Sequence, residues 1–514
     1  MDTSKTVSRS ALSFFSGTLL SRVSGMLRDM VMAFFFGTSP ALAAFFLAYR
    51  FVYLLRRLLG EGLFHQGFIP HFEAKNKVDP REGALFFRDL FWSLAIFLGG
   101  LLLAAALFLY SLLHFGVISS GGEQIARLSL WMVPGIFFIC LFGLTSGLLQ
   151  SGRKFFLTSS AGVIFNLVWI TGAILLHPLP IDQAVVGLAA ILSVAFFCQW
   201  GATVLPTWQS LHPFLSKKEL FRPQLFSREL KKLVGPLLFG IVGVASMQIN
   251  SAVDVIFARC GSMEGPAYLW YAIRLQQLPL ALFGIALASA LLPSLSRKHA
   301  SGDVAGFSSL LQFASKRTFL LILPCVVGIF LLGGASINML FGRGDFSLLA
   351  TEKTTLCLWG YGIGLLPAAF IQIFAPAFYA RKDYRTPMIG FVASAVVNIA
   401  LNAYMIFSLH LGAEAVAFST SIAAWLNGIY LFTQLKKARS ESPVSKEWGY
   451  FMKVSACCLF AGVLGLAGRG LVFEGGAHFP RDLISQISRF GIPALIYFAA
   501  LFPLSKVIRQ NKPI

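Results

Sequence analysis

The sequence predicts an all-α, polytopic membrane protein with about fourteen transmembrane helices, arranged as two six-helix lobes followed by two additional helices. Three observations lead to this fold class. Of the 514 residues, 56% are hydrophobic and only 12% are charged, whereas soluble domains carry about 25% charged residues. Long apolar segments recur throughout the chain, and the basic residues between them alternate in density.

Apolar segments of membrane-spanning length define the individual helices. A span needs about 20 largely apolar residues. The first segment contains charged residues and runs too long for a cleavable signal, so we expect it to remain in the mature protein. The predicted spans are 11–36, 40–59, 87–113, 128–150, 156–177, 184–206, 233–258, 266–296, 318–336, 354–380, 386–408, 411–434, 453–468 and 490–506.

The 42 lysines and arginines test this count, because they concentrate in every second loop. Loop 207–232, for example, holds six of them. Basic loops lie on the cytoplasmic side of a membrane, which places both termini in the cytoplasm. The net charge of +20 is therefore expected to face anionic lipid, and we expect no nucleic-acid partner.

The chain also contains an internal repeat. Glycine, arginine, lysine and asparagine residues recur at positions shifted by 224 to 232. Each copy contains an even number of spans, so the two copies have the same orientation in the membrane and are parallel repeats. The matching pairs are Gly37 and Gly261, Arg50 and Arg274, Arg153–Lys154 and Arg381–Lys382, and Asn166 and Asn398. The predicted domains are an N-terminal lobe at 1–206, a basic cytoplasmic linker at 207–232, a C-terminal lobe at 233–435, and two further helices at 436–514.

Six arginines interrupt otherwise apolar spans. A charge at membrane depth costs about 2.5 to 3.5 kcal/mol on insertion scales, so such residues commonly mark a functional site. Guanidinium groups match phosphate oxygens with a planar fork of donors, which indicates a phosphate or diphosphate receptor between two rocking lobes. The six are Arg22, Arg28, Arg50, Arg56, Arg57 and Arg274.

Helical spacing predicts how some of these charges are compensated. Arg22 and Asp29 are seven residues apart and should share a helix face, with Arg28 pointing elsewhere. Arg57 and Glu61 are four apart and could neutralise each other. The alternative is that the arginines extend to the membrane interface and only determine topology.

No constellation in the sequence resembles an active site. The eight histidines are scattered, the seven cysteines lack metal-ligand spacing, and no phosphate-binding loop is present. We therefore expect no enzyme activity and no cofactor other than a coupling sodium ion. Three classes remain open: a flippase for lipid-linked oligosaccharides, a cation-coupled multidrug exporter, and a membrane enzyme acting on lipid phosphates. The arginines favour the first.

Several motifs resemble those of the MurJ/MviN family, in family order over essentially the whole chain. They are Ser21 to Asp29, Ala44 to Ala48, Leu54 to Arg57 with Glu61-Gly62, Phe68 to Pro70, Leu291 to Ser296, Phe341 to Phe346, and Ala375 to Asp383 with Thr386-Pro387. This resemblance implies a fourteen-helix exporter of the MOP superfamily in the bacterial inner membrane. It also implies flipping of lipid II, the undecaprenyl-diphosphate-linked precursor of peptidoglycan, with cell-wall synthesis proteins and membrane lipids as partners.

By resemblance, four of the arginines match the cavity residues that bind the diphosphate, namely Arg22, Arg28, Arg56 and Arg274; Arg50, Arg57 and Asp29 are supporting candidates. The last two spans match a lipid-facing groove for the polyprenyl tail. The chain departs from the family where Ala43, Ile273 and Gln277 replace acidic residues and where Phe51-Val52-Tyr53 replaces a common Leu-Pro-Asn. The missing acids make the predicted cavity more positive.

A sodium site is the last prediction. Asp254 lies in a stretch that resembles the family's sodium-binding seventh helix. Asn398 and Asn402, four apart on one helix face, and Thr420 in the next helix could complete a cage of oxygen ligands for a hard monovalent cation. Two alternatives stay open: the asparagines form hydrogen bonds between helices, or the membrane potential drives transport.

Overall fold

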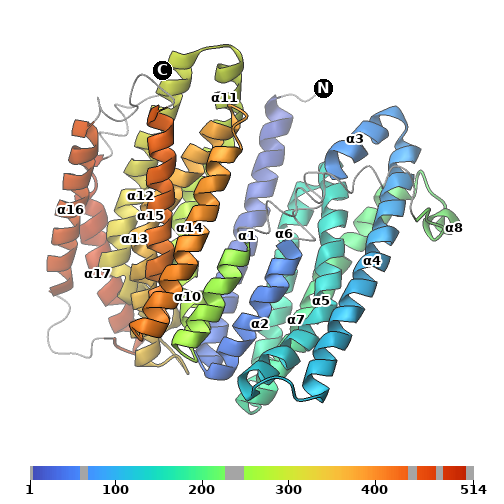
Figure 1. Ribbon diagram of the computed structural model, residues 1–514, viewed down its shortest axis with the longest axis horizontal. Helices are drawn as coiled ribbons and strands as arrows, with labels where there is room; N and C mark the ends of the chain where they lie inside the picture. Colours follow the sequence, from blue (N-terminus) through green and yellow to red (C-terminus); the bar gives the residue numbers. More distant parts are fainter. Residues whose placement is uncertain (1–3, 58–67, 226–247, 438–447, 471–478, 505–514) are drawn as a thin grey trace. The chain divides into compact units, whose positions relative to one another are not determined.

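The computed structural model describes residues 4–57, 68–225, 248–437, 448–470 and 479–504. All regular secondary structure in these ranges is helical, which confirms the predicted fold class. The chain divides into two compact units, Met1–Ala252 and Val253–Ile514, and each is described by itself (Figure 1).

The first unit is a bundle in which α5 is the central helix. It packs against α2, α4 and α7, while α1 packs along α6. The helices are α1 (Ser4–Phe36), α2 (Pro40–Arg56), α3 (Ile69–Val78), α4 (Pro80–His114), α5 (Ser120–Ser151), α6 (Phe155–Leu176), α7 (Ile181–Leu211) and α8 (Lys217–Leu220).

The second unit is built around α13, which packs against α10, α12 and α15. Residues 248–261 are also helical. The other elements are α10 (Gly265–Pro279), the π-helix η3 (Leu280–Gly284), α11 (Ile285–Ala300), α12 (Val304–Phe341), α13 (Leu348–Tyr379), α14 (Arg385–Ala403), the π-helix η4 (Tyr404–Ser408), α15 (Glu414–Lys437), α16 (Trp448–Gly470) and α17 (Leu483–Ala500).

The helix packing repeats between the two units. Four pairs of packed helices in the first unit have counterparts in the second unit. The pair α5–α7 corresponds to α13–α15, α6–α7 to α14–α15, α4–α5 to α12–α13, and α2–α5 to α10–α13. The turns before α6 and α14 contain Arg153 and Lys382, which share a left-handed φ of 61° although neither is glycine. The sequence repeat therefore has a counterpart in local backbone geometry as well as in packing.

Polar caps begin several of these helices. Ser39 accepts a hydrogen bond from the Leu42 N–H at the start of α2, and Asp79 accepts one from the Arg81 N–H at the start of α4. Proline follows each cap at the first helical position, where its missing N–H is not needed.

Each predicted span overlaps helical residues, but the helices extend beyond several predicted boundaries. Ten described helices are long and apolar enough to cross a membrane, so the count of fourteen stays a prediction. The predicted span 266–296 is not one regular helix, because η3 follows Pro279, which lacks the N–H that a regular α-helix requires. The predicted linker 207–232 begins inside α7, which continues to Leu211; residues 226–232 lie outside the described ranges.

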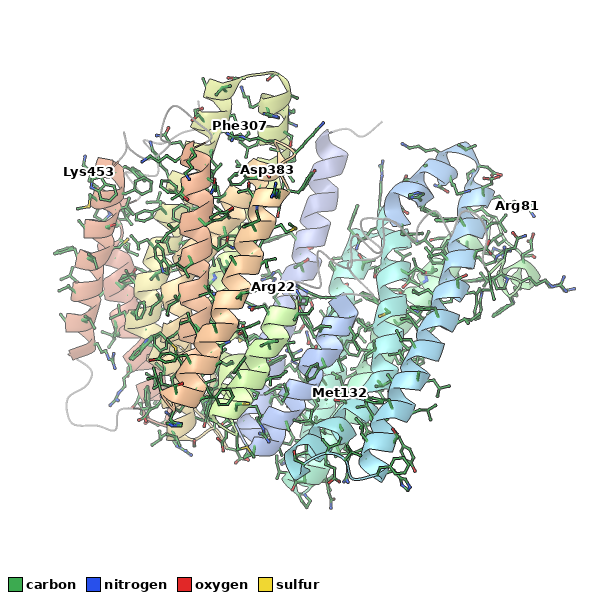
Figure 2. All side chains as sticks on the ribbon, viewed as in Figure 1. Arg22, Arg81, Met132, Phe307, Asp383 and Lys453 are labelled. Atoms are coloured by element: carbon green, nitrogen blue, oxygen red, sulfur yellow. The ribbon has the colours of Figure 1, made fainter. Side chains whose placement is uncertain are left out.

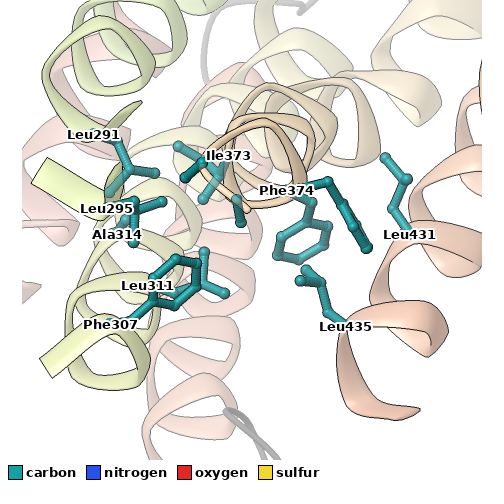
Figure 3. Packing of buried hydrophobic residues seen from close by; sticks show 12 residues of the cluster. Leu291, Leu295, Phe307, Leu311, Ala314, Ile373, Phe374, Leu431 and Leu435 are labelled. Carbon is teal, nitrogen blue, oxygen red and sulfur yellow. The ribbon is translucent and has the colours of Figure 1, made fainter. Parts of the chain in front are cut away.

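A hydrophobic cluster joins α11, α12, α13 and α15 in the second unit (Figure 3). Phe374 on α13 lies between Leu431 and Leu435 of α15 on one side and the α11–α12 residues on the other. In water-soluble proteins, complete burial of one large apolar side chain stabilises the fold by about 1.5 to 3 kcal/mol. The additional helices α16 and α17 pack against each other and against α12.

A buried ion pair attaches the chain segment after α7 to α4. Arg88 donates to the Asp89 carboxylate through Nε at 2.8 Å and Nη2 at 2.6 Å. Arg88 also donates to the Glu219 carbonyl at 3.1 Å, and Asp89 accepts from the Gln224 N–H at 2.9 Å. Both charged side chains thus bind the backbone of the linker as well as each other.

Two further contacts hold the linker beside α4. The Trp92 indole donates to the Leu220 carbonyl at 2.8 Å, and Arg81 pairs with Glu219 at 2.7 Å on the surface (Figure 2). Hydrogen bonds from the Ser216 backbone and hydroxyl, and then from Arg81, lower the pKa of Glu219 to about 2. The carboxylate therefore stays ionised through the neutral and mildly acidic range.

Replacing Arg88 with alanine is expected to destabilise the first unit by about 3 to 5 kcal/mol, because it leaves the Asp89 charge buried without its partner. The measurement is the free energy of unfolding of the purified protein in a detergent titration. Arg81→Ala is the matched control. Its exposed pair with Glu219 should contribute less than about 1 kcal/mol. Equal losses in the two variants would contradict this account of the linker attachment.

Candidate functional site

Arg28 and Asp29 form a buried ion pair on α1. The guanidinium contacts the Asp29 carboxylate through Nη2 at 2.7 Å and Nε at 3.0 Å, and the two residues are 6% and 1% exposed. The predicted separation of Arg28 from Asp29 is therefore wrong. Consecutive residues point about 100° apart on a helix, but the long arginine side chain folds around to its neighbour.

Two residues of α6 complete the environment of Arg28. Its Nη1 donates to the Asn166 side-chain oxygen at 3.0 Å, and the guanidinium carbon lies 4.5 Å from the centre of the Trp169 ring. The Asn166 amide nitrogen donates to the Ser24 hydroxyl at 2.8 Å. A carboxylate, an amide oxygen and an aromatic face thus surround one buried cation, which is how proteins tolerate such a charge.

Arg22 lies near the middle of α1 and is exposed (Figure 2). It forms no ion pair or hydrogen bond with Asp29, so the predicted Arg22–Asp29 compensation is also wrong. Within the described ranges its guanidinium has no counter-charge. In a helix that crosses a bilayer, such a group must reach water or an anion.

Arg50, Arg56 and Arg57 gather around one aromatic ring on α2. Their guanidinium carbons lie 5.5, 5.7 and 5.3 Å from the centre of the Tyr53 ring. Arg50 and Arg57 are seven residues apart, and both lie beside this ring. The predicted pair of Arg57 with Glu61 cannot be described, because Glu61 lies outside the described residues.

Arg274 on α10 is partly buried, and its guanidinium lies 4.2 Å from the centre of the Trp270 ring. Its counterpart in the repeat, Arg50, contacts Tyr53 in a similar way. An aromatic ring one turn away supports each guanidinium without neutralising its charge. The two repeat-related arginines thus share an aromatic neighbour on their own helix.

The predicted sodium ligands converge on one carboxylate. The Asp254 Oδ1 accepts from the Asn398 amide at 2.6 Å and from the Asn402 amide at 2.9 Å, and Oδ2 accepts from the Thr420 hydroxyl at 3.5 Å. Asp254, Asn398 and Asn402 are all buried. Three separate helical segments thus place a carboxylate, two amides and a hydroxyl in one cluster.

The chemistry of this cluster fits a monovalent cation. The Asn402 Oδ1 is buried and has no hydrogen-bond partner among the described residues. Rotation of an asparagine amide by half a turn exchanges its nitrogen and oxygen, so the same side chain can donate to a carboxylate or offer oxygen to a cation. Oxygen-only ligands are those that hard cations prefer.

Comparison with known proteins identifies the family. The family model described as Lipid II flippase MurJ matches residues 32–479. A Burkholderia cenocepacia protein named lipid II flippase MurJ is 31% identical and aligns over 96% of both chains. A Chlamydia muridarum protein named probable lipid II flippase MurJ is also 31% identical, covering 81% of this chain and 76% of that protein. The chain belongs to the MurJ family.

Solved structures agree with this family at the level of fold. A MurJ lipid II flippase in an inward closed conformation matches with a TM-score of 0.77 and 22% identity, covering 96% of this chain and 99% of that chain. An inward-facing MATE multidrug transporter of the MOP superfamily matches with a TM-score of 0.65 and 18% identity, covering 84% and 100%. This MurJ family member therefore has the MOP superfamily fold.

The aromatic partners of the arginines were not found from the sequence of this MurJ family member. Trp169, Tyr53 and Trp270 contact Arg28, the α2 arginines and Arg274 respectively. The spacing offers a signal for two of them, because Tyr53 and Trp270 lie three or four residues from their arginines on the same helix. Trp169 could not be found in this way, since it reaches Arg28 from another helix.

An apolar cavity of about 330 Å³ lies between α12, α13, α15 and α16. Aromatic side chains from all four helices line it, including Phe319, Phe370, Trp425 and Trp448. A cavity of this size and composition can take part of a hydrocarbon chain. It involves α16, one of the two helices for which the family resemblance implied a groove for the polyprenyl tail.

Proposed function

We propose that this protein flips lipid II, the lipid-linked precursor of peptidoglycan, across the bacterial inner membrane. Two lines of support meet here: membership of the MurJ family and arginines that lie within the predicted membrane spans 11–36, 40–59 and 266–296. The observation that carries the proposal is Arg22, an exposed guanidinium near the middle of α1 with no counter-charge in the described ranges. Charged residues within membrane spans commonly mark a substrate or ion pathway, and a guanidinium favours an anionic ligand.

In this proposal the diphosphate is bound by guanidinium groups. Arg22, Arg28, Arg56 and Arg274 are the principal ligands, with Arg50, Arg57 and Asp29 in support. A diphosphate offers several charged oxygens, and each guanidinium can bind two of them in a forked geometry. The rings of Tyr53 and Trp270 keep the guanidinium groups oriented before the ligand arrives, which reduces the entropy lost on binding.

The polyprenyl tail has a different environment. We place part of it in the apolar cavity beside α16, where aromatic residues replace contacts with lipid chains. The two ends of lipid II thus contact chemically different surfaces, and alternating access moves the polar end while the tail stays in an apolar medium.

Sodium coupling at Asp254 completes the proposal. When bound, a sodium ion would supply a positive charge that neutralises the buried carboxylate. Asp254, Asn398, Asn402 and Thr420 would hold it, with the amides rotated so that oxygen faces the ion. Occupancy of this cluster would change the charge between three helical segments and so favour one packing of them over another.

The direct test is lipid II translocation in vesicles that contain the purified protein. Lipid II reaching the outer leaflet is measured by its accessibility to an impermeant modifying enzyme. Wild-type protein should flip lipid II, and Arg22→Ala should reduce the rate at least about thirtyfold, which corresponds to about 2 kcal/mol. Arg127→Ala is the matched control, because Arg127 is exposed and paired with Glu123. Flipping by Arg22→Ala at the rate of the control would overturn the assigned role.

A further inference from the structure

The segment 216–222, which follows α7 and contains α8, presents an aromatic ring among basic side chains. Phe221 is 68% exposed, and Lys217, Lys218 and Arg222 are exposed as well. The segment lies beside α4 at the edge of the first unit (Figure 1). An exposed aromatic ring among cations is typical of a segment that lies on a membrane surface.

Contacts with α4 on both sides of Phe221 fix the position of this ring. Before it, the Leu220 carbonyl accepts from the Trp92 indole at 2.8 Å. After it, the Gln224 N–H donates to the Asp89 carboxylate at 2.9 Å. The centres of the Phe221 and Trp92 rings are 5.6 Å apart. The exposed ring is therefore held at one level along α4.

That level is the end of an apolar stripe on α4. Ile96 lies four residues after Trp92, and Leu103 and Leu107 follow on the same face. All three are exposed, and α4 is long and apolar enough to cross a membrane. Exposed apolar residues on such a helix face lipid chains. Phe221, stacked on Trp92, thus lies where the lipid chains meet the headgroups.

The charges of the segment are not neutralised by the acids that attach it. Arg88 pairs with Asp89 at 2.6 Å, and Arg81 pairs with Glu219 at 2.7 Å. Within the described ranges, the three exposed basic residues of the segment form no ion pair; they are Lys217, Lys218 and Arg222. The segment therefore presents three positive charges beside a ring at headgroup level.

We infer that the segment 216–222 binds an anionic phospholipid of the bilayer, with Phe221 between the upper parts of the lipid chains and the basic side chains on the phosphodiester. Continuity with the apolar stripe of α4 indicates a bilayer as the partner, and the uncompensated charge indicates an anionic headgroup. The buried pair of Arg88 and Asp89 then holds a lipid-binding surface at a fixed depth. This inference is independent of the proposed transport of lipid II.

The test places the photoreactive residue p-benzoylphenylalanine at position 221 of the full-length protein, in vesicles with equal amounts of phosphatidylglycerol and phosphatidylcholine. Mass spectrometry identifies what the label captures. Phosphatidylglycerol should exceed phosphatidylcholine among the adducts at least about fivefold, which corresponds to about 1 kcal/mol. High salt should lower this ratio. Replacing the three basic residues of the segment should bring it close to one, in the variant Lys217→Gln, Lys218→Gln, Arg222→Gln.

Two controls separate this surface from general exposure and general charge. Val78 is 85% exposed and precedes α4, whose first residue lies about 18 Å before Trp92 along the helix axis. The same label at position 78 should capture no lipid. The matched charge variant removes three exposed lysines of the second unit and should keep the wild-type ratio; it is Lys436→Gln, Lys437→Gln, Lys453→Gln.

Capture of protein alone, or no capture of lipid, at position 221 overturns the inferred membrane contact. Equal capture of the two lipids with all three basic residues present overturns the recognition of anionic lipid. A second measurement uses protein with Phe221 in place. Phosphatidylglycerol added to the detergent-purified protein should raise its thermal unfolding midpoint more than that of the variant without the three basic residues. Equal shifts overturn the inference.

Discussion

Replacing Arg274 with alanine is expected to lower the rate of lipid II flipping by at least about a hundredfold. The guanidinium carbon lies 4.2 Å from the centre of the Trp270 ring, which supports its orientation for the proposed contact with the diphosphate. Loss of a partner in a desolvated charged contact costs about 2 to 5 kcal/mol, and a value of about 3 kcal/mol, near the lower part of this range, corresponds to a hundredfold. Vesicle translocation of lipid II measures the effect.

Lysine at position 274 separates charge from geometry. An ammonium keeps the charge but loses the planar fork and most of the stacking on Trp270. We expect Arg274→Lys to retain partial activity, about tenfold below wild type. Arg297→Ala controls for the loss of a basic residue, since Arg297 is exposed at the end of α11. If Arg274→Ala and Arg297→Ala flip equally well, Arg274 does not bind the substrate.

Replacing Asp254 with asparagine is expected to remove the dependence of flipping on a sodium gradient. The carboxylate is the one charged group in the cluster with Asn398, Asn402 and Thr420. Without that charge, a desolvated cation has no compensation for its lost hydration. The asparagine keeps nearly the same volume and can still hydrogen-bond, so the fold should persist. The flipping rate should fall at least about tenfold in an imposed sodium gradient.

The assay compares vesicles with a sodium gradient, with a potassium gradient, and with a membrane potential alone. Asp182→Asn is the matched control, because Asp182 is exposed at the start of α7. A wild-type rate that follows the membrane potential and ignores sodium would contradict this mechanism. So would an Asp254→Asn protein that keeps the wild-type response to sodium.

Sequence spacing predicted the asparagine cluster well. Asn398 and Asn402 lie four residues apart, so the helix itself places both on one face. The same logic failed for Arg28 and Asp29. Helical spacing describes where the Cβ atoms point, and a long side chain with several torsions can turn toward a neighbour that lies on another face. Asn166 and Trp169 on α6 stabilise the conformation that Arg28 takes.

The linker attachment shows a second limit of sequence reasoning. Basic residues predict that 207–232 is a cytoplasmic loop, but Arg88, Asp89 and Trp92 lie in the predicted span 87–113 and nothing in the sequence pairs them with that loop. Their hydrogen bonds to backbone groups near Glu219 and Gln224 join positions more than 100 residues apart. Composition carries no information on such pairings, because any loop carbonyl could accept these bonds.

By itself, the sequence determined the all-helical membrane class, the internal repeat and the family. The length of the apolar segments and the alternation of basic loops indicate the class, and motifs of uncommon residues indicate the repeat and the family, because all of these are local properties of the chain. Tertiary structure alone decided that Asp29 binds Arg28, that Trp169 reaches Arg28 from α6, and that Asn398 and Asn402 turn their amide nitrogens toward Asp254. The physical reason is burial: in a medium that cannot solvate charge, each ionic group takes the partner that packing brings within reach.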